Sequence, residues 1–180
     1  MSKFTTKITK RLQKFIETQK IFFIATAPIA GRINLSPKGM DSFKVINENR
    51  VLWLNVTGSG NETAAHLSEN GRITIMFCSF EKAPNILRLY GKGKELKSND
   101  EGWKEVVSLF PETPGTRQIF DITIESTQSS CGMSIPFFEF KGERNDLNEW
   151  ATEQGTDNLK NYWKDKNQTS IDGLPTHILE

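Results

Sequence analysis

The stretch from Thr57 to Thr63 places two glycines and three polar side chains where a predicted strand runs into a predicted helix. Glycines let a ligand approach the backbone closely, and the first turn of a helix offers free N–H groups to an anion. Ser59, Asn61 and Thr63 add side-chain donors, so the stretch suits a phosphate group. The same residue types also describe an ordinary strand-to-helix turn with an asparagine cap, and the stretch alone leaves both interpretations open.

Two better-known nucleotide loops are excluded by the residue types in this stretch. A Walker A loop ends in Gly-Lys-Ser or Gly-Lys-Thr, whereas this loop ends in Asn61-Glu62-Thr63. A dinucleotide fingerprint needs a third glycine three residues after the second, and Thr63 stands at that position. The loop therefore predicts neither a P-loop nor a Rossmann site.

A second polar segment, residues 34–39, ends an early predicted strand with a hydroxyl, a proline-fixed turn and a lysine. Lys38 could pair with a phosphate, although a lysine at a strand end is also a common solvated surface charge. Its interest lies in its combination with the loop at residues 58–63.

The other reactive residue types favour neither hydrolysis nor a metal site. His66 and His177 are the two histidines and lie far apart, and the two cysteines, Cys78 and Cys131, form no CxxC pair. We expect His66 on a helix surface and Cys131 as a small buried residue. No Ser/His/Asp or Cys/His set can be assembled, so no catalytic residue is named.

Composition excludes two classes of partner. Lys and Arg total 23 against 22 Asp and Glu, and the basic residues form no stripe that could follow a nucleic acid. No window is apolar enough to span a bilayer, and the N-terminal residues carry no apolar run of signal-peptide length. These features and the distant cysteines predict a cytoplasmic protein with no nucleic-acid or membrane partner.

The elements that must position these residues are short and mostly β. Apolar residues recur at helical spacing in residues 1–20, in a capped helix at residues 61–71 and in a connecting helix at residues 98–110. Strand signals occupy residues 21–27, 32–36, 51–56, 72–78, 86–90 and 117–125. Six strands without regular intervening helices predict a mainly β fold, an antiparallel barrel with peripheral helices.

The C-terminal third differs in character from the predicted barrel. It contains an exposed-looking aromatic patch with Phe137, Phe138 and Phe140, a feature typical of an interface. We expect one domain over residues 1–164, including an N-terminal helix in residues 1–20 and a C-terminal helical segment in residues 141–164. A polar tail, residues 165–180, is expected to fray.

Four blocks of sequence, taken in order and spacing, resemble the FMN-binding, pyridoxamine 5′-phosphate-oxidase-like family. The blocks are residues 33–39, 51–67, 72–78 and 86–91. The resemblance covers residues from about 16 to 151 and extends to a branch marked by residues 130–132, 136–138 and 142–147. It implies a six-stranded antiparallel split β-barrel that forms a homodimer, with two FMN sites in the clefts between the subunits.

The resemblance also implies which residues bind the cofactor. Lys38 matches a lysine that the family places at the end of its second strand, and the loop that meets the FMN phosphate contains Ser59, Asn61 and Thr63. The strand that lines the flavin ring and ribityl chain corresponds to residues 53–56. The predicted cofactor-binding residues are Asn34, Ser36, Lys38, Trp53, Leu54, Asn55, Val56, Ser59, Asn61 and Thr63.

Two departures from the family pattern concern the phosphate and the substrate. The family's oxidases carry Ser-Arg-Lys where this chain has residues 61–63, so Glu62 must point away from the phosphate or FMN binds weakly. True pyridoxamine phosphate oxidases end with a Trp-Gln pair, an arginine and Leu-x-Asp-Arg, of which only Arg144 is matched. The missing second arginine predicts that vitamin B6 is not the substrate.

Three functions remain open at this point. The first is an FMN-dependent oxidoreductase that acts on an unidentified small molecule, with the cofactor supplying the chemistry. The second is a binding or sensing module that holds flavin, haem or a deazaflavin without turnover. The third is a structural dimer with an empty cleft.

Overall fold

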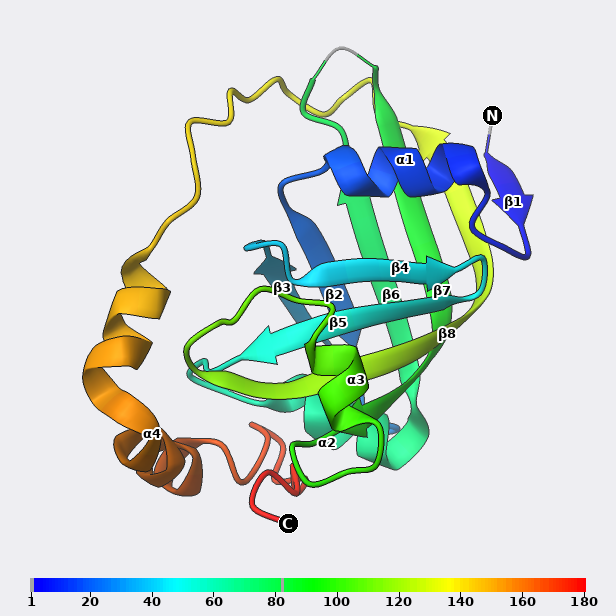
Figure 1. The fold of residues 1–180 in the computed structure, drawn as a ribbon. Helices are drawn as coiled ribbons and strands as arrows, with labels where there is room; N and C mark the ends of the chain where they lie inside the picture. The colour runs from blue at the N-terminus through cyan, green and yellow to red at the C-terminus, as the bar shows by residue number, and fades with distance from the viewer. Residues whose placement is uncertain (1, 82) are drawn as a thin grey trace.

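A computed structural model describes residues 2–81 and 83–180 and contains one strongly curled antiparallel sheet with four helices around it (Figure 1). The hydrogen-bonded order is β3-β2-β6-β7-β8-β5-β4, and β1 pairs with an extension of β8. The strands are β1 (Lys3–Thr5), β2 (Phe22–Thr26), β3 (Asn34–Lys38), β4 (Phe43–Asn47), β5 (Arg50–Val56), β6 (Arg72–Cys78), β7 (Asn85–Leu96) and β8 (Thr116–Cys131). The helices are α1 (Lys10–Thr18), α2 (Glu62–Asn70), α3 (Trp103–Val107) and α4 (Asp146–Lys166).

The expected mainly β antiparallel fold is confirmed, with eight strands in place of six. The two additional strands are β1 and β4. Strand β4 forms a hairpin with β5 around the Asn47–Arg50 pair, so the turn expected before β5 also closes a strand that the sequence pattern did not reveal. Strand β1 finds an edge because β8 continues to Cys131 and offers Thr127, Gln128 and Ser129 for pairing.

The molecule has two hydrophobic cores, and β5 and β8 contribute apolar side chains to both, one core on each face. The main core fills the curled sheet, and a smaller one lies between α3 and the outer face of β5 and β8. Alternation along β5 sends Val51 and Trp53 into the main core and Leu52 and Leu54 into the smaller one. The fully buried members of the main core are Ile24, Val51, Ile75, Leu87, Leu89, Phe120 and Ile122. Two buried faces fix the register of β5, the strand that leads into the polar loop.

The last residues of the chain pack against the barrel, so the expectation of a frayed tail is wrong. Asn167 and Thr176 have no exposed surface, and Ile178 is 8% exposed. The Trp163 side chain donates from Nε1 to Thr57 Oγ1 at 2.8 Å. Backbone bonds inside the tail, such as Thr176 N–H to the Gln168 carbonyl at 2.9 Å, hold its fold. Short polar segments become ordered when their backbone groups find such partners.

His66 is also not a surface residue. It is 1% exposed, and its Nδ1 lies 3.0 Å from Thr26 Oγ1. Burial lowers the pKa of His66, which favours the neutral ring. Among the described residues, no helix has the length and apolar character needed to cross a membrane. Within the same residues, no group of three or more His, Cys, Asp or Glu side chains could hold a metal ion.

Gly91 allows β7 and β8 to approach at a shift in their register. A Cβ atom there would lie 2.1 Å from the backbone oxygen of Thr123. We expect Gly91→Ala to lower the free energy of unfolding by about 3 kcal/mol, because two paired strands would have to separate. Gly102→Ala is the control, since its φ of +84° is strained but no atom lies within 4 Å of the new Cβ; it should cost about 1 kcal/mol. Urea unfolding measures both free energies. Equal decreases in the free energy of unfolding of the two variants would contradict the tight approach of the strands at Gly91.

Candidate functional site

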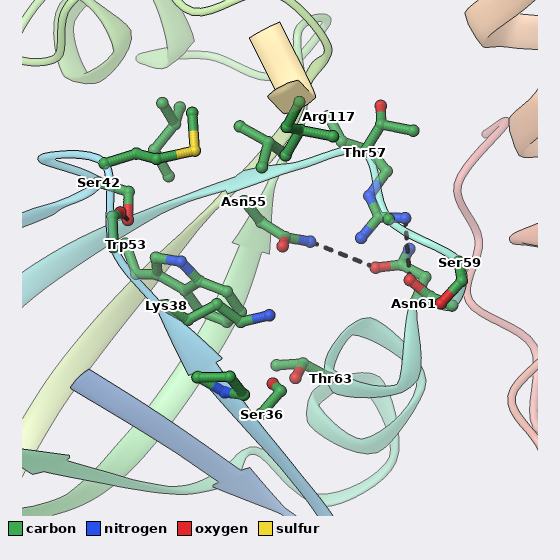
Figure 2. Close-up of a pocket in the computed structure, with 18 of the residues that line it drawn as sticks. Ser36, Lys38, Ser42, Trp53, Asn55, Thr57, Ser59, Asn61, Thr63 and Arg117 are labelled. Atoms are coloured by element: carbon green, nitrogen blue, oxygen red, sulfur yellow. Dashed lines mark hydrogen bonds between the residues drawn. The ribbon is translucent and has the colours of Figure 1, made fainter. Parts of the chain in front are cut away.

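A pocket of about 390 Å³ lies where β5 ends and α2 begins, facing the end of β3 (Figure 2). Its other walls come from the start of β8 and from Thr113 and Leu147. The pocket is lined by all ten predicted residues: Asn34, Ser36, Lys38, Trp53, Leu54, Asn55, Val56, Ser59, Asn61 and Thr63. The structure thus brings two segments that are separate in the sequence to one place, while their role as cofactor ligands stays a prediction.

The loop after β5, residues 57–61, is anchored at Thr57, and its other residues line the pocket. Thr57 is buried, and both its N–H and its Oγ1 donate to the Gly115 carbonyl at 2.8 Å. Ser59 is exposed at the top of the loop. The N–H groups of Ala64 and Ala65 donate to the Asn61 carbonyl, whereas those of Glu62 and Thr63, at the very start of α2, have no acceptor inside the helix and can serve a ligand.

Asn61 stands at the N-cap position of α2, yet its side chain makes no capping bond. Its Oδ1 accepts hydrogen bonds from Asn55 Nδ2 at 3.4 Å and from Gln118 Nε2 at 2.9 Å. Asn61 is 2% exposed, and its Nδ2 is buried without a partner within the described part of the chain. A buried donor without an acceptor is costly, so this geometry favours a ligand loop over an ordinary capped turn.

Lys38 carries a positive charge into the pocket. Figure 2 shows its side chain extending between Trp53 and Thr63, and Nζ lies 5.3 Å from the centre of the Trp53 ring. Burial, followed by the positive charge of Arg117, lowers the pKa of Lys38 to about 8. No ion pair involves Lys38 within residues 2–81 and 83–180. A cation in this setting favours an anionic ligand, because the ligand would supply the missing opposite charge.

Sequence reasoning missed a second buried cation, Arg117, at the start of β8. The side chain is 7% exposed and lines the pocket. Burial lowers the pKa of Arg117 to about 10, so the side chain remains charged at neutral pH. An arginine at the start of an alternating predicted strand was the available signal, but only the fold places that strand start beside Gly60.

Glu62 stands where the family's oxidases carry an arginine. Its carboxylate contacts the C-terminal segment. Both carboxylate oxygens lie 3.1 Å from the backbone N–H of Ile171. Glu62 still lines the pocket, but a neutral backbone donor of the C-terminal segment engages its negative charge.

A larger groove of about 1120 Å³ joins the pocket along residues 37–40 and at Leu147. Its walls come from α1 and from the extended segment before α4, including Phe138, Phe140 and Arg144. Phe137 and Phe138 are 78% and 64% exposed, which agrees with the exposed patch expected from the sequence. The combined shape is a small polar pocket that opens into a wide apolar groove.

The donor set of the small pocket fits a phosphate group. Two cations, the N-terminus of α2, the hydroxyls of Ser59 and Thr63 and the free Asn61 amide border it. Replacing the hydration of a phosphate dianion requires such donors.

Comparison of the sequence with known proteins identifies the family of this chain. The family model described as pyridoxamine 5′-phosphate oxidase matches residues 8–131. A pyridoxamine 5′-phosphate oxidase family protein of Aspergillus flavus, ustO, is 34% identical over 192 residues, which cover 96% of this chain and 76% of the relative.

Two solved structures share the fold at low sequence identity. A proposed pyridoxamine 5′-phosphate oxidase from Lactobacillus delbrueckii superimposes with a TM-score of 0.55 at 18% identity, covering 68% of this chain and 94% of that one. A HupZ variant from Group A Streptococcus gives a TM-score of 0.54 at 19% identity, covering 68% and 99%. These likenesses confirm the split-barrel fold.

The electrostatic strain at Lys38 predicts a gain in stability when its charge is removed. We expect Lys38→Met to raise the free energy of unfolding of the ligand-free protein by roughly 1–3 kcal/mol at neutral pH. The folded-state pKa is lowered from 10.5 to about 8, so the penalty is fully present below pH 8 and is relieved as the pH rises toward 10.5. The gain should therefore shrink over that interval.

Urea unfolding at neutral and at alkaline pH measures this difference. Lys94→Met is the control, because Lys94 is an exposed lysine on β7. If both variants changed the free energy of unfolding equally at both pH values, the charge of Lys38 would not destabilise the folded protein.

Proposed function

We propose that this chain, which belongs to the pyridoxamine 5′-phosphate oxidase family, binds FMN and acts as a flavin-dependent oxidoreductase on a small molecule. The observation that carries the proposal is the convergence of Lys38, Asn61 and the N-terminus of α2 on one pocket beside β5. These groups suit the phosphate end of FMN, and the adjoining strand suits its ring and ribityl chain. A bound flavin would supply hydride and electron transfer.

The chain's own residues would bind and orient the cofactor. Lys38 would neutralise part of the phosphate charge, and Ser59 and Thr63 would donate hydrogen bonds to its oxygens. Trp53 and Leu54 have side chains that are 2% exposed, so β5 would meet the flavin mainly through backbone groups and the amide of Asn55. The larger groove would admit the substrate from the side opposite the phosphate loop.

The residues around the pocket favour flavin over haem. Neither histidine lines the pocket: His66 is buried against Thr26, and His177 lies beside Glu180. Imidazole is a common axial ligand of haem iron. Vitamin B6 is not part of the proposal, since Arg144 lies on the groove without the second arginine of the true oxidases.

Titration with FMN and with riboflavin tests the proposal, because riboflavin keeps the ring and lacks the phosphate. We expect the wild type to bind FMN much more tightly than riboflavin. Lys38→Ala should weaken FMN binding roughly tenfold to a hundredfold by loss of a charge-assisted contact, and Thr63→Ala should weaken it less. Riboflavin binding should change little in either variant. Flavin fluorescence measures the affinities, and Lys94→Ala is the control.

Equal affinity for FMN and riboflavin in the wild type would refute the phosphate site. A visible spectrum of the purified protein distinguishes flavin from haem directly.

We further propose that the chain forms a homodimer with the cofactor at the subunit interface, as the family resemblance implies. The exposed aromatic side chains and the open groove beside the pocket support this arrangement. Sedimentation should show a dimer at micromolar concentration. Phe137→Asp should weaken the dimer and FMN binding together, whereas Ile29→Asp, at a residue that is 75% exposed elsewhere, should change neither. A stable wild-type monomer that binds FMN would contradict the shared site.

A further inference from the structure

The C-terminal segment that follows α4 reaches the phosphate loop from outside the pocket. Asn167, the first residue after α4, has no exposed surface and contacts two parts of the site. Its Nδ2 donates to the Gly58 carbonyl at 3.1 Å, and its Oδ1 accepts a hydrogen bond from Arg117 Nη1 at 2.7 Å. One side chain thus ties the loop to the arginine.

The hydrogen-bond partners of Arg117 are neutral oxygens, and Arg117 forms no ion pair among the described residues, so Glu95 and Tyr162 compensate its charge only through space. Nη1 also donates to the Gly60 carbonyl at 3.1 Å, and Nε is buried without a partner within the described residues. The nearby carboxylate of Glu95 pairs with Lys97 at 3.5 Å. Neutral oxygens orient a guanidinium group but do not cancel its charge, and burying an uncompensated charge is costly.

The same C-terminal segment also restrains the acidic residue of the loop. The Ile171 N–H donates to the Glu62 carboxylate, and the next residue, Asp172, pairs with Arg32. The segment therefore does two things: it holds the Arg117 cation at the pocket, and it gives the carboxylate of Glu62, which also lines the pocket, a backbone donor.

We propose that Arg117 is a second cationic ligand of the flavin phosphate and that Asn167 is the positioning residue that holds Arg117 and Gly58 in the binding geometry. The inference rests on the proposed function. Arg117 and Lys38 approach from β8 and β3, so a phosphate between them would be neutralised from two sides (Figure 2). This pair of cations would replace the Arg-Lys pair that the loop itself lacks.

Substitution of Asn167 by aspartate tests the positioning role. The new carboxylate can still accept from Arg117, but it neutralises the guanidinium group and loses the donor to Gly58. We expect Asn167→Asp to weaken FMN binding about tenfold or more while riboflavin binding stays within about twofold of the wild type. Gln168→Asp is the matched control, because it adds the same charge at the adjacent exposed position and should leave both affinities unchanged.

Substitution of Arg117 tests the ligand role. Arg117→Gln should lower the ratio of FMN to riboflavin affinity about tenfold to a hundredfold, and Arg117→Lys should restore part of that ratio because it keeps the charge. A purely structural role would lower both affinities together and would leave the ratio unchanged. If Asn167→Asp does not fold, the comparison of the two Arg117 variants decides the inference.

The outcomes separate this inference from the proposed function. Wild-type preference for FMN with an unchanged ratio in Arg117→Gln would overturn the inference and leave the phosphate site at Lys38 intact. Absence of any preference for FMN in the wild type would overturn both.

Discussion

The curl of the single sheet is the constraint on which the site depends. Strands β3 and β5 are far apart in the hydrogen-bonded order, with β2, β6, β7 and β8 between them, yet residues of both line one pocket. The long pairing of β7 with β8, relieved at Gly91, lets the sheet bend enough for the two ends to face each other. A flat sheet with the same pairing would leave Lys38 and the loop after β5 on distant edges.

Electrostatics at the site oppose folding and favour ligand binding. Lys38 and Arg117 repel each other in a partly desolvated pocket, and neither has a carboxylate partner among the ion pairs of the described residues. The packing of β5 and β8 in two cores offsets this cost. Such arrangements are typical of binding sites, where local instability is retained because the ligand relieves it.

Sequence reasoning succeeded where local chemistry decides structure. The glycine loop and the start of α2 at residue 62 follow from residue types over short windows, and the strand expected at residues 32–36 forms two residues later, at Asn34–Lys38. Sequence reasoning failed where contacts with residues far away in the sequence decide the position of a side chain or segment. Arg117 and the tail gain their roles from contacts 50 or more residues away, and His66 is buried by a strand 40 residues earlier. The hairpin strand β4 was missed because it is short and its apolar residues do not alternate throughout, since Val45 and Ile46 are adjacent.

The contact between the C-terminal segment and the loop after β5 also sets the order in which parts of the pocket form during synthesis. Asn167 meets Gly58, and Ile171 meets Glu62, across sequence separations of 109 residues. Contacts between residues so far apart in the sequence form late, and they reduce the rate of folding. On the ribosome the loop leaves the exit tunnel long before its partners are translated, so the barrel can begin to pair while the anion pocket is still incomplete. Completion of the pocket therefore waits until residues 167–171 have been translated.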